Sequence, residues 1–349
     1  MKFCITGGGT GGHLSIADAL CNAAIERGHE VIFIGSTNGQ DRMWFGEHSS
    51  FSHVYFLETT GVVNQSKLGK IKALYKIYKA FKKSIALLGE HQIQAVISVG
   101  GFSAAPASFA SVFSKIPLFI HEQNAVIGKL NSILRPRAKL FISAYEKDAP
   151  LQGYPVKEQF FKTARVRKKL ETIIFLGGSQ GAKAINDLAL HVSPALKEKN
   201  IKIIHQCGER DFERVKAEYE KLGIDVELYS FTKEMPALIA RADLAVSRAG
   251  ASTLWELCAN GVPTFYVPYP HAAGDHQFYN AQFIVQEEMG WCEREGEGLA
   301  EKLLEILEEP LYPQGTLHVK SKKLLEHSHK DVALEMIKLF EQKVQGDGC

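Results

Sequence analysis

The stretch ITGGGTGGH, residues 5–13, places five glycines in six positions after a short apolar run and ends on a histidine. Two further apolar runs also end in glycine-containing loops, ISVGGFSAAP (97–106) and IFLGGSQGAKA (174–184). Glycine allows a tight turn and close backbone approach, and a following helix presents unpaired N–H groups and a positive dipole end. Such loops suit an anion or a sugar ring.

Gly7, Gly9 and Gly12 also satisfy the GxGxxG pattern of dinucleotide-binding proteins. That pattern requires an acidic residue about 20 positions later, at the end of the second strand, to hold a ribose hydroxyl. Here the second apolar run ends in Gly35 and Ser36. The sequence therefore disfavours NAD, and we expect no cofactor. Tight helix packing alone could explain one glycine loop, but three at strand ends favour ligand binding.

The segment SRAGASTLWELCANG (247–261) predicts a second anion site. Gly250 allows a turn, Ser252 is the expected N-cap, and a helix from Thr253 would direct its first amides at a diphosphate without a metal. Glu256, one turn further, either accepts hydrogen bonds from two ribose hydroxyls or compensates the helix dipole. The residues expected to bind substrate here are Ala251, Ser252, Thr253, Leu254 and Glu256.

Polar side chains end another predicted strand, in HEQNAVIGKLN (121–131). Histidine is a general base near neutral pH without a large pKa shift, and a helix N-terminus keeps it neutral. His13 is therefore the first candidate for a base, the alternative being that it caps its helix or contacts a diphosphate. Glu122 is the reserve base, although it and His121 could equally belong to a satisfied hydrogen-bond network.

In DHQFYNA (275–281) two amides and an imidazole, from His276, Gln277 and Asn280, suit the hydroxyls of a hexose. An ordinary polar helix face is the alternative. The sequence contains no HExxH, no clustered Cys/His spacing and no DxD, so we expect no metal site.

Composition is that of an ordinary globular protein, with 45% apolar and 23% charged residues among 349. Lys and Arg (41) barely exceed Asp and Glu (39), which gives no case for a nucleic-acid partner. Six scattered cysteines without CxxC spacing predict reduced, mostly buried thiols of a cytosolic protein. We expect neither export nor a membrane span.

Apolar runs alternate with helical patterns, which predicts α/β structure with parallel sheets. The predicted strands are 2–6, 30–35, 53–58, 95–100, 118–122 and 139–143, followed by 172–178, 201–207, 226–231, 244–250 and 264–270. Two Rossmann-like domains in tandem explain them, with a linker near 153–160. The amphipathic segment 331–344 could return to the first domain, which gives domains of 1–155 plus 331–349 and 156–330.

Six motifs in order, TGGGTGGH, VGGFSAAP, HEQNAVIGKLN, LGGSQGAKAIN, SRAGASTLWEL and DHQFYNA, resemble the MurG family of peptidoglycan glycosyltransferases. The resemblance covers residues 5–282. It implies a GT-B fold, with two Rossmann-like domains and their parallel sheets facing across a cleft. It further implies inverting transfer of N-acetylglucosamine (GlcNAc) from UDP-GlcNAc to the muramoyl 4-hydroxyl of the undecaprenyl-linked muramoyl-pentapeptide lipid I, giving lipid II. Family members are peripheral enzymes at the cytoplasmic face of the cell inner membrane.

The resemblance also assigns site residues. It implies that Asn124 contacts donor and acceptor, that Gln277 and His276 bind the GlcNAc ring, and that Glu256 binds ribose. It extends substrate contacts to Thr10, Gly11, Gly12, Lys157, Ser179 and Thr232. Three positions depart from the family pattern: Ile16 replaces a usual proline, Lys157 a frequent arginine and Thr232 a usual isoleucine.

The segment 67–88 carries seven lysines and no acid, with Leu74, Tyr75, Tyr78 and Phe81 recurring at helical spacing. This pattern is typical of a basic amphipathic helix at an anionic lipid surface, or of a solvated helix packed on the sheet; both can hold together. Two rival functions remain: a UDP-GlcNAc epimerase of the same architecture, and a non-catalytic sugar-nucleotide-binding scaffold.

Overall fold

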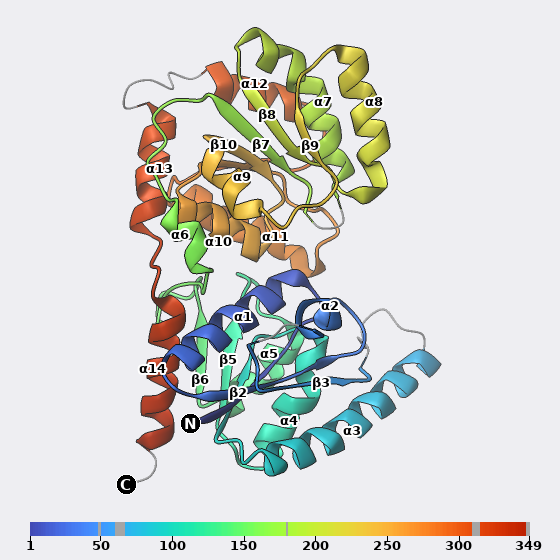
Figure 1. Cartoon of the computed structure of the whole chain (residues 1–349), viewed down its shortest axis with the longest axis vertical. Helices are drawn as coiled ribbons and strands as arrows, with labels where there is room; N and C mark the ends of the chain where they lie inside the picture. The colour runs from blue at the N-terminus through green and yellow to red at the C-terminus, as the bar shows by residue number, and fades with distance from the viewer. Residues whose placement is uncertain (48–49, 60–66, 179–180, 309–314, 347–349) are drawn as a thin grey trace. The chain divides into compact units, whose positions relative to one another are not determined.

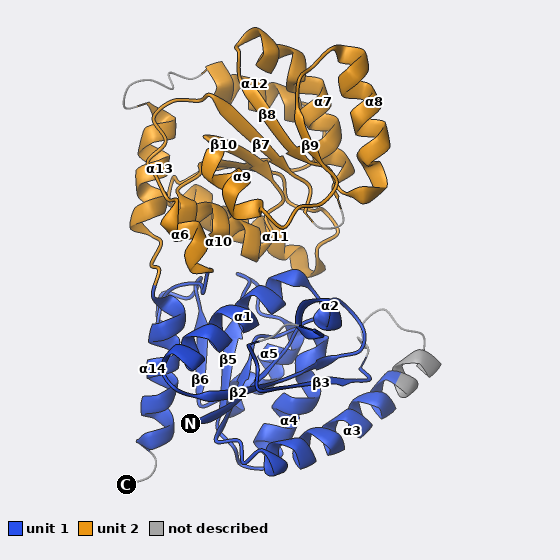
Figure 2. Cartoon of the chain, viewed as in Figure 1, with its two compact units in different colours: residues 1–156, 331–349 blue, residues 157–330 orange. Residues whose placement is uncertain are grey.

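The computed structural model describes residues 1–47, 50–59, 67–178, 181–308 and 315–346, and within 67–72 the backbone alone. The chain divides into two compact units, residues 1–156 with 331–349 and residues 157–330 (Figures 1 and 2). Each unit is a parallel sheet with its own hydrophobic core, and the last segment of the chain returns to the first unit.

The sheet of the first unit has the strand order β3-β2-β1-β4-β5-β6, with every neighbouring pair parallel. This is the doubly wound order, in which ligands bind where the chain reverses direction across the sheet, here between β1 and β4. The strands are β1 (Lys2–Thr6), β2 (Glu30–Ser36), β3 (His53–Leu57), β4 (Ala95–Ser98), β5 (Leu118–Glu122) and β6 (Leu140–Ser143).

Helices cover this sheet and close its core of Cys4, Ile34, Val96 and Ile120. They are α1 (Gly11–Glu26), α2 (Asp41–Phe45), α3 (Lys67–Glu90), α4 (Ala105–Phe113), α5 (Lys129–Leu134) and α14 (Val332–Gln345), with 3₁₀ turns at Phe102–Ala104 and Arg135–Arg137. Central strands buried on both faces read as nearly continuous apolar runs, which is why they were recognisable in the sequence.

The second unit repeats the design, with the strand order β12-β11-β10-β7-β8-β9 and again only parallel neighbours. Its reversal point lies between β7 and β10. The strands are β7 (Thr172–Leu176), β8 (Lys202–Gln206), β9 (Glu227–Tyr229), β10 (Leu244–Ser247), β11 (Thr264–Tyr266) and β12 (Trp291–Cys292).

The helices of the second unit are α6 (Glu158–Lys162), α7 (Lys183–Glu198), α8 (Phe212–Leu222), α9 (Met235–Arg241), α10 (Ala251–Asn260), α11 (His276–Gln286), α12 (Leu299–Glu308) and α13 (Thr316–Glu326). Two 3₁₀ turns, Glu209–Asp211 and Ala273–Asp275, complete it. Most predicted strands were too long at their C-terminal ends, because the chain leaves the sheet at the first loop residue. The two-residue strand β12 was missed, since so short an edge strand has no periodicity.

Five cysteines lie in the described part of the chain as free thiols, four of them buried, while Cys349 lies outside it. No helix among the described residues is long and apolar enough to span a membrane.

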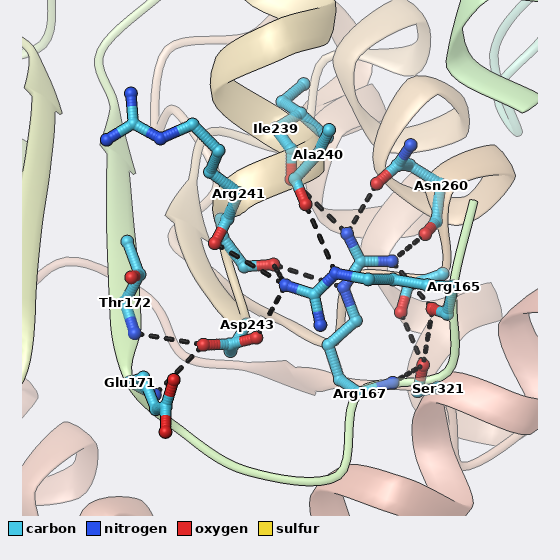
Figure 3. Close-up of polar contacts among 12 residues, drawn as sticks. Arg165, Arg167, Glu171, Thr172, Ile239, Ala240, Arg241, Asp243, Asn260 and Ser321 are labelled. Carbon is cyan, nitrogen blue, oxygen red and sulfur yellow. Dashed lines mark hydrogen bonds and ion pairs between the residues drawn. The ribbon is translucent and has the colours of Figure 1, made fainter. Parts of the chain in front are cut away.

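A buried arginine joins two helix ends in the second unit (Figure 3). The Arg167 side chain, fully buried, donates hydrogen bonds to the carbonyls of Ile239 (3.3 Å) and Ala242 (3.1 Å) at the end of α9. It also donates to the carbonyl and the side-chain oxygen of Asn260, the last residue of α10. The carbonyls of Ala242 and Asn260 have no backbone donor among the described residues, and the Ile239 carbonyl also accepts the N–H of Ala242, so one guanidinium adds hydrogen bonds at the C-terminal ends of both helices. Burial lowers the Arg167 pKa to about 9, which leaves it charged at neutral pH.

The C-terminal helix α14 packs on α1, as the amphipathic pattern of 331–344 predicted. Its buried face consists of Val332, Met336, Ile337 and Phe340, with Phe340 stacked on Phe119 of β5 at 4.4 Å between ring centres. Leu334 and Leu339, apolar residues of the same helix, are only half-buried.

One carboxylate ties α14 to the end of α1. Glu341 accepts two hydrogen bonds from Arg27, both 2.7 Å, and a further contact from His29. Chiefly through the Arg27 bonds, the pKa of Glu341 falls to about 2, against an ordinary 4.5. A carboxyl with a lowered folded-state pKa stabilises the protein above its unfolded pKa and loses that contribution as the pH falls through the folded value.

We therefore expect acid to loosen α14. The stabilisation that Glu341 contributes should be lost as the pH falls from 4.5 to 2. After allowance for solvent screening, we expect the free energy of unfolding to decrease by about 1 kcal/mol. A Glu341→Gln variant should be destabilised by that amount at pH 7 and lack this component of the acid titration. Denaturant unfolding at a series of pH values measures both. Parallel pH curves for the variant and the wild type would contradict the assignment.

Candidate active site

The glycine loop after β1 is tied to the loop after β4, at the reversal point of the first sheet. The N–H of Gly8 donates to the carbonyl of Gly100 at 3.2 Å. A Cβ placed on Gly7, whose φ is +128°, would lie 2.5 Å from that carbonyl oxygen, so no larger residue fits. Only glycine combines this φ with such close backbone approach. The loop then leads directly into α1.

Helix α1 begins at Gly11, with Thr10 as its N-cap, and its first intrahelical bond runs from Leu14 N–H to the Thr10 carbonyl at 3.3 Å. The amides of Gly11, Gly12 and His13 therefore have no intrahelical acceptor. Thr10 does not cap them with its side chain. This arrangement of amides and helix dipole is a site for an anion.

His13 lies in the first turn of α1, half-buried, with a polar partner at each ring nitrogen. The Thr10 hydroxyl lies 2.9 Å from Nδ1, and the Gln123 side-chain nitrogen lies 2.8 Å from Nε2. With the Gln123 amide nitrogen assigned to this position, it donates to Nε2, which makes Nε2 the accepting nitrogen and leaves the proton on Nδ1. In this tautomer Nε2 has the lone pair that a base needs. A substrate hydroxyl would have to replace Gln123 at that position.

Glu122, at the end of β5, is buried and accepts three hydrogen bonds. Oε1 receives the N–H of Asn124 at 3.0 Å, and Oε2 receives the N–H of Gly128 and the side-chain nitrogen of Asn131, both at 2.9 Å. These bonds bend the chain after β5 and hold Asn124, half-buried, just beyond the strand. The carboxylate thus organises this loop, which is the network role foreseen as one of its two alternatives.

His121 is fully buried and stacks edge-on with Tyr154 at 5.6 Å between ring centres. Neither of its ring nitrogens has a hydrogen-bond partner among the described residues. Burial, followed by the charge of His13, lowers the pKa of His121 to about 3. His121 is therefore neutral at pH 7, and its burial and its contact with Tyr154 favour a supporting role over a direct one.

In the second unit α10 begins at Ala251 with Gly250 as its N-cap, so the prediction that Ser252 caps a helix from Thr253 was wrong. Ser252 is already inside the helix, and its hydroxyl donates to Oε1 of Glu256 at 3.0 Å. The first amides of α10, from Ala251 to Thr253, precede its first intrahelical bond, between Leu254 N–H and the Gly250 carbonyl. They form a second anion site at the end of β10.

Glu256 is half-buried in the second turn of α10, beyond the first turn where dipole compensation acts. Burial raises the pKa of its carboxyl, while the Ser252 hydroxyl and the charge of Lys157 lower it. Lys157 lies immediately before α6, as its N-cap residue. The charge of Lys157 therefore acts on Glu256, one turn beyond the first amides of α10.

The predicted hexose-binding residues lie in the first turns of α11. Gln277 accepts a hydrogen bond from the N–H of Tyr269 at 3.0 Å, which directs its amide nitrogen elsewhere, and His276 Nδ1 contacts the Ala273 carbonyl at 2.9 Å. Asn280 is fully buried and donates to the Ala249 carbonyl at 3.1 Å. It therefore helps to hold the loop before α10, and the hexose contact predicted for it stays a prediction.

Two other predicted site residues have no described contact with the groups above. Thr232, half-buried after β9, accepts a hydrogen bond from the N–H of Glu234 at 2.9 Å and so shapes a turn. Ser179 lies outside the described residues.

Three residues near these sites were missed from the sequence. Gln123 and Asn131 contact His13 and Glu122, and Arg248 donates to the carbonyls of Val267 (3.0 Å) and Pro268 (3.3 Å). Gln123 and Asn131 both lie inside the motif 121–131, and for Gln123 the available signal was its polarity directly after β5, whereas Asn131 lies in α5. Arg248 is likewise a polar residue directly after a strand, β10. Among the described residues no group of three or more His, Cys, Asp or Glu side chains could hold a metal ion.

Two doubly wound units, each with a glycine-rich loop and a helix N-terminus at its reversal point, define a glycosyltransferase-type two-domain architecture. Models of the glycosyltransferase family 28 N-terminal and C-terminal domains match residues 3–142 and 172–336. The chain belongs to glycosyltransferase family 28 and, within it, to the MurG family.

The relatives cover the whole chain. A UDP-N-acetylglucosamine–N-acetylmuramyl-(pentapeptide) pyrophosphoryl-undecaprenol N-acetylglucosamine transferase of Sulfurimonas denitrificans is 64% identical over 97% of both chains. A transferase of the same name from Sulfurovum is 49% identical over 98% of both. The crystal structure of Acinetobacter baumannii MurG superposes with a TM-score of 0.77 at 26% identity, covering 98% of this chain and 99% of that one. The predicted family and the two-domain α/β fold class are confirmed.

Proposed function

We propose that the protein transfers GlcNAc from UDP-GlcNAc to the muramoyl 4-hydroxyl of lipid I, with inversion and without a metal, to form lipid II. The observation that carries the proposal is the 64% identity, along 97% of the chain, to a transferase of that name. The site supports it, because a neutral imidazole and two uncapped helix N-termini are the groups that such a transfer requires.

In the proposed reaction His13 Nε2 accepts the proton of the 4-hydroxyl while that oxygen attacks the anomeric carbon. The bond between this carbon and the diphosphate oxygen breaks on the opposite face, so the configuration inverts. UDP leaves with the bonding electrons, and the first amides of α10 stabilise its charge. Nδ1 stays protonated and bound to Thr10 throughout, which keeps the ring oriented. The amides of Gly11 and Gly12 are proposed to bind the acceptor diphosphate.

Binding of UDP-GlcNAc is assigned to the second unit, with Glu256 on the ribose and Gln277 and His276 on the sugar. We expect Glu256→Gln to weaken UDP binding about 10- to 100-fold, since hydrogen bonds to a charged group contribute about 1.5–3 kcal/mol. The wild type should prefer UDP to 2′-deoxy-UDP, and the variant should lose this preference. Calorimetric titration with both nucleotides measures it.

Glu213→Gln, an exposed acid in the first turn of α8, is the matched control and should bind both nucleotides as the wild type does. Undiminished discrimination by the Glu256 variant would remove the ribose assignment and leave Glu256 as a structural residue.

The acceptor carries a lipid, and α3 offers a surface suited to it. Leu74, Tyr75 and Tyr78 are 51–58% exposed, and Phe113 of α4, which contacts Phe81 edge-on, is 70% exposed. Lys79 and Lys82 lie over the rings of Tyr75 and Tyr78. The opposite side of α3, with Ala80, Leu87 and Leu88, packs into the core. The helix is thus packed inward and basic-aromatic outward, which supports peripheral binding to anionic lipid at the cytoplasmic membrane face.

Vesicle binding tests this surface. A Lys79→Gln, Lys82→Gln variant should bind phosphatidylglycerol vesicles about 30-fold more weakly in sedimentation, because each lysine near an anionic surface contributes about 1 kcal/mol. The same change at Lys216 and Lys221, exposed on α8, should have no effect. Equal losses in both variants would indicate general charge attraction and contradict a specific membrane surface on α3.

The decisive experiment measures UDP release from UDP-GlcNAc in EDTA, with and without a lipid I analogue in detergent. Release that depends on the analogue, with a GlcNAc-bearing lipid product, is the expected result. UDP release without acceptor, together with a free epimerised sugar, would indicate an epimerase. UDP binding without any turnover would indicate a scaffold, and either result overturns the proposal.

A further inference from the structure

Asp41 is a fully buried carboxylate outside the residues assigned above, and it lies against the glycine loop. It opens the short helix α2, five residues after β2 ends. Oδ1 accepts the N–H of Gly9 at 2.5 Å, and Oδ2 accepts the N–H of Ser36 at 2.7 Å. One carboxylate thus connects the loop after β1 with the end of β2.

The space around this carboxylate is closed by glycines. A Cβ on Gly8 would lie 2.6 Å from both carboxylate oxygens, and a Cβ on Gly35 would lie 2.7 Å from Oδ2. A Cβ on Gly39, which precedes α2, would lie 2.7 Å from the Gly9 Cα. The glycines at these positions therefore allow Asp41 to reach the loop backbone, in addition to any role in ligand binding.

Burial raises the pKa of Asp41, while the N–H groups of Ser36 and Gly9 act in the opposite direction. A buried carboxylate is unfavourable unless hydrogen bonds compensate it, so its position here requires a strong and well-directed pair of donors. The Gly9 amide is consequently committed to Asp41 and is not available to a substrate anion. The amides left for one are those that follow it, at the start of α1.

We propose that Asp41 is a positioning residue for the transfer reaction: by holding the Gly9 amide it sets the direction in which the loop enters α1, and with it the places of Thr10 and His13. The chain of contacts runs from Asp41 to Gly9, and through the next residue, Thr10, whose hydroxyl lies 2.9 Å from His13 Nδ1. The inference rests on the proposed function, because its consequence for turnover assumes that His13 is the base.

Asp41→Asn is nearly isosteric but brings an NH₂ group against one of the two backbone donors. We expect kcat with the lipid I analogue to fall about 10- to 100-fold, as small misplacements of a catalytic group do. The KM for UDP-GlcNAc, which depends on the second unit, should stay unchanged. Hydrogen exchange of the peptide 5–14 should become at least about tenfold faster, since the Gly9 amide loses its acceptor.

Asp243→Asn is the matched control. Asp243, directly before β10 in the other unit, is also buried; its carboxylate accepts the N–H groups of Glu171 and Thr172 at the start of β7, at 2.9 and 3.0 Å, and pairs with Arg165 at 2.7 Å. This variant should lose thermal stability without changing kcat or the exchange of 5–14. Gly35→Ala is a second route if the Asp41 variant does not fold: the added Cβ would meet Oδ2 of Asp41 at 2.7 Å and, closer still, the Phe33 ring, so its thermal stability is measured beside kcat and the exchange of 5–14.

The inference would be overturned if the peptide 5–14 exchanged its amide hydrogens at the wild-type rate in both the Asp41 and the Gly35 variants. So would equal losses of kcat in the Asp41 and Asp243 variants, since these would reflect stability alone. Failure of the proposed function is distinguishable: the wild type would then show no acceptor-dependent UDP release, whereas the exchange measurement would still decide whether Asp41 holds the loop.

Discussion

Replacing His13 by alanine is expected to lower kcat for acceptor-dependent UDP release by about 10²- to 10⁴-fold, the usual contribution of a general base. The hydrogen bonds with Thr10 and Gln123 favour the tautomer in which the imidazole Nε2 accepts a proton. Binding of UDP-GlcNAc should be unaffected. Turnover at saturating concentrations of both substrates and calorimetric titration of the donor measure the two effects.

Two further variants make the result specific. His53→Ala removes an exposed histidine from β3 and should leave kcat unchanged. Glu122→Gln replaces one oxygen of a carboxylate that accepts three hydrogen bonds, so it should lower thermal stability as well as activity. If instead the Glu122 variant lost kcat with normal stability while His13→Ala stayed within tenfold of the wild type, the base would be Glu122.

Arg167→Met is expected to destabilise the second unit by about 2–6 kcal/mol, because two buried oxygens of Asn260 lose the guanidinium and each buried acceptor left without a donor costs about 1–3 kcal/mol. The substitution removes the donor to the carbonyl and the side-chain oxygen of Asn260 at the end of α10, whereas the carbonyls of Ile239 and Ala242 keep the Ala242 N–H and Arg165 as donors (Figure 3). Because α10 carries the proposed diphosphate site at its other end, UDP binding should weaken as the unit loosens.

Urea unfolding measures the loss. Trp255 and Trp291 lie in the second unit, so a Trp44→Phe background makes tryptophan fluorescence report on that unit alone. Arg241→Met is the matched control: its exposed ion pair with Glu227 should contribute at most about 1 kcal/mol. A shift for Arg167→Met no larger than that of the control would mean that water replaces the guanidinium without loss.

Much of the fold was predictable from local pattern. Buried parallel strands such as β1 and β7 are uninterrupted apolar runs, and glycine loops mark where they end. Helix α14 was predictable because its apolar residues recur at helical spacing. Boundaries were less certain: the start of α10 was misplaced because serine is a common N-cap, whereas Gly250 serves here.

The site shows the same division. The motifs placed His13, Glu122, Glu256 and Gln277 at strand or helix ends, and family resemblance supplied their expected ligands. The motifs did not reveal that Gln123 contacts His13 across 110 positions of sequence, or that Asn280 is buried beneath the loop before α10. Asp41 was overlooked for a related reason. A ribose-binding acid was expected only at the end of the second strand, and Asp41 lies five positions beyond Ser36, to whose N–H it is hydrogen-bonded.

The sequence alone thus determined the α/β class, the glycine loops, the family and the residue types available for chemistry, because these depend on composition, short-range spacing and motif order. Only the tertiary structure decided which of these residues meet. Strand order brings β1, β4 and β5 together, and with them His13, Gly100, Gln123 and Glu122. Burial then makes Glu122 a saturated acceptor and His121 a neutral packing residue. Such roles depend on donors and solvent exclusion contributed by distant segments, which no local pattern encodes.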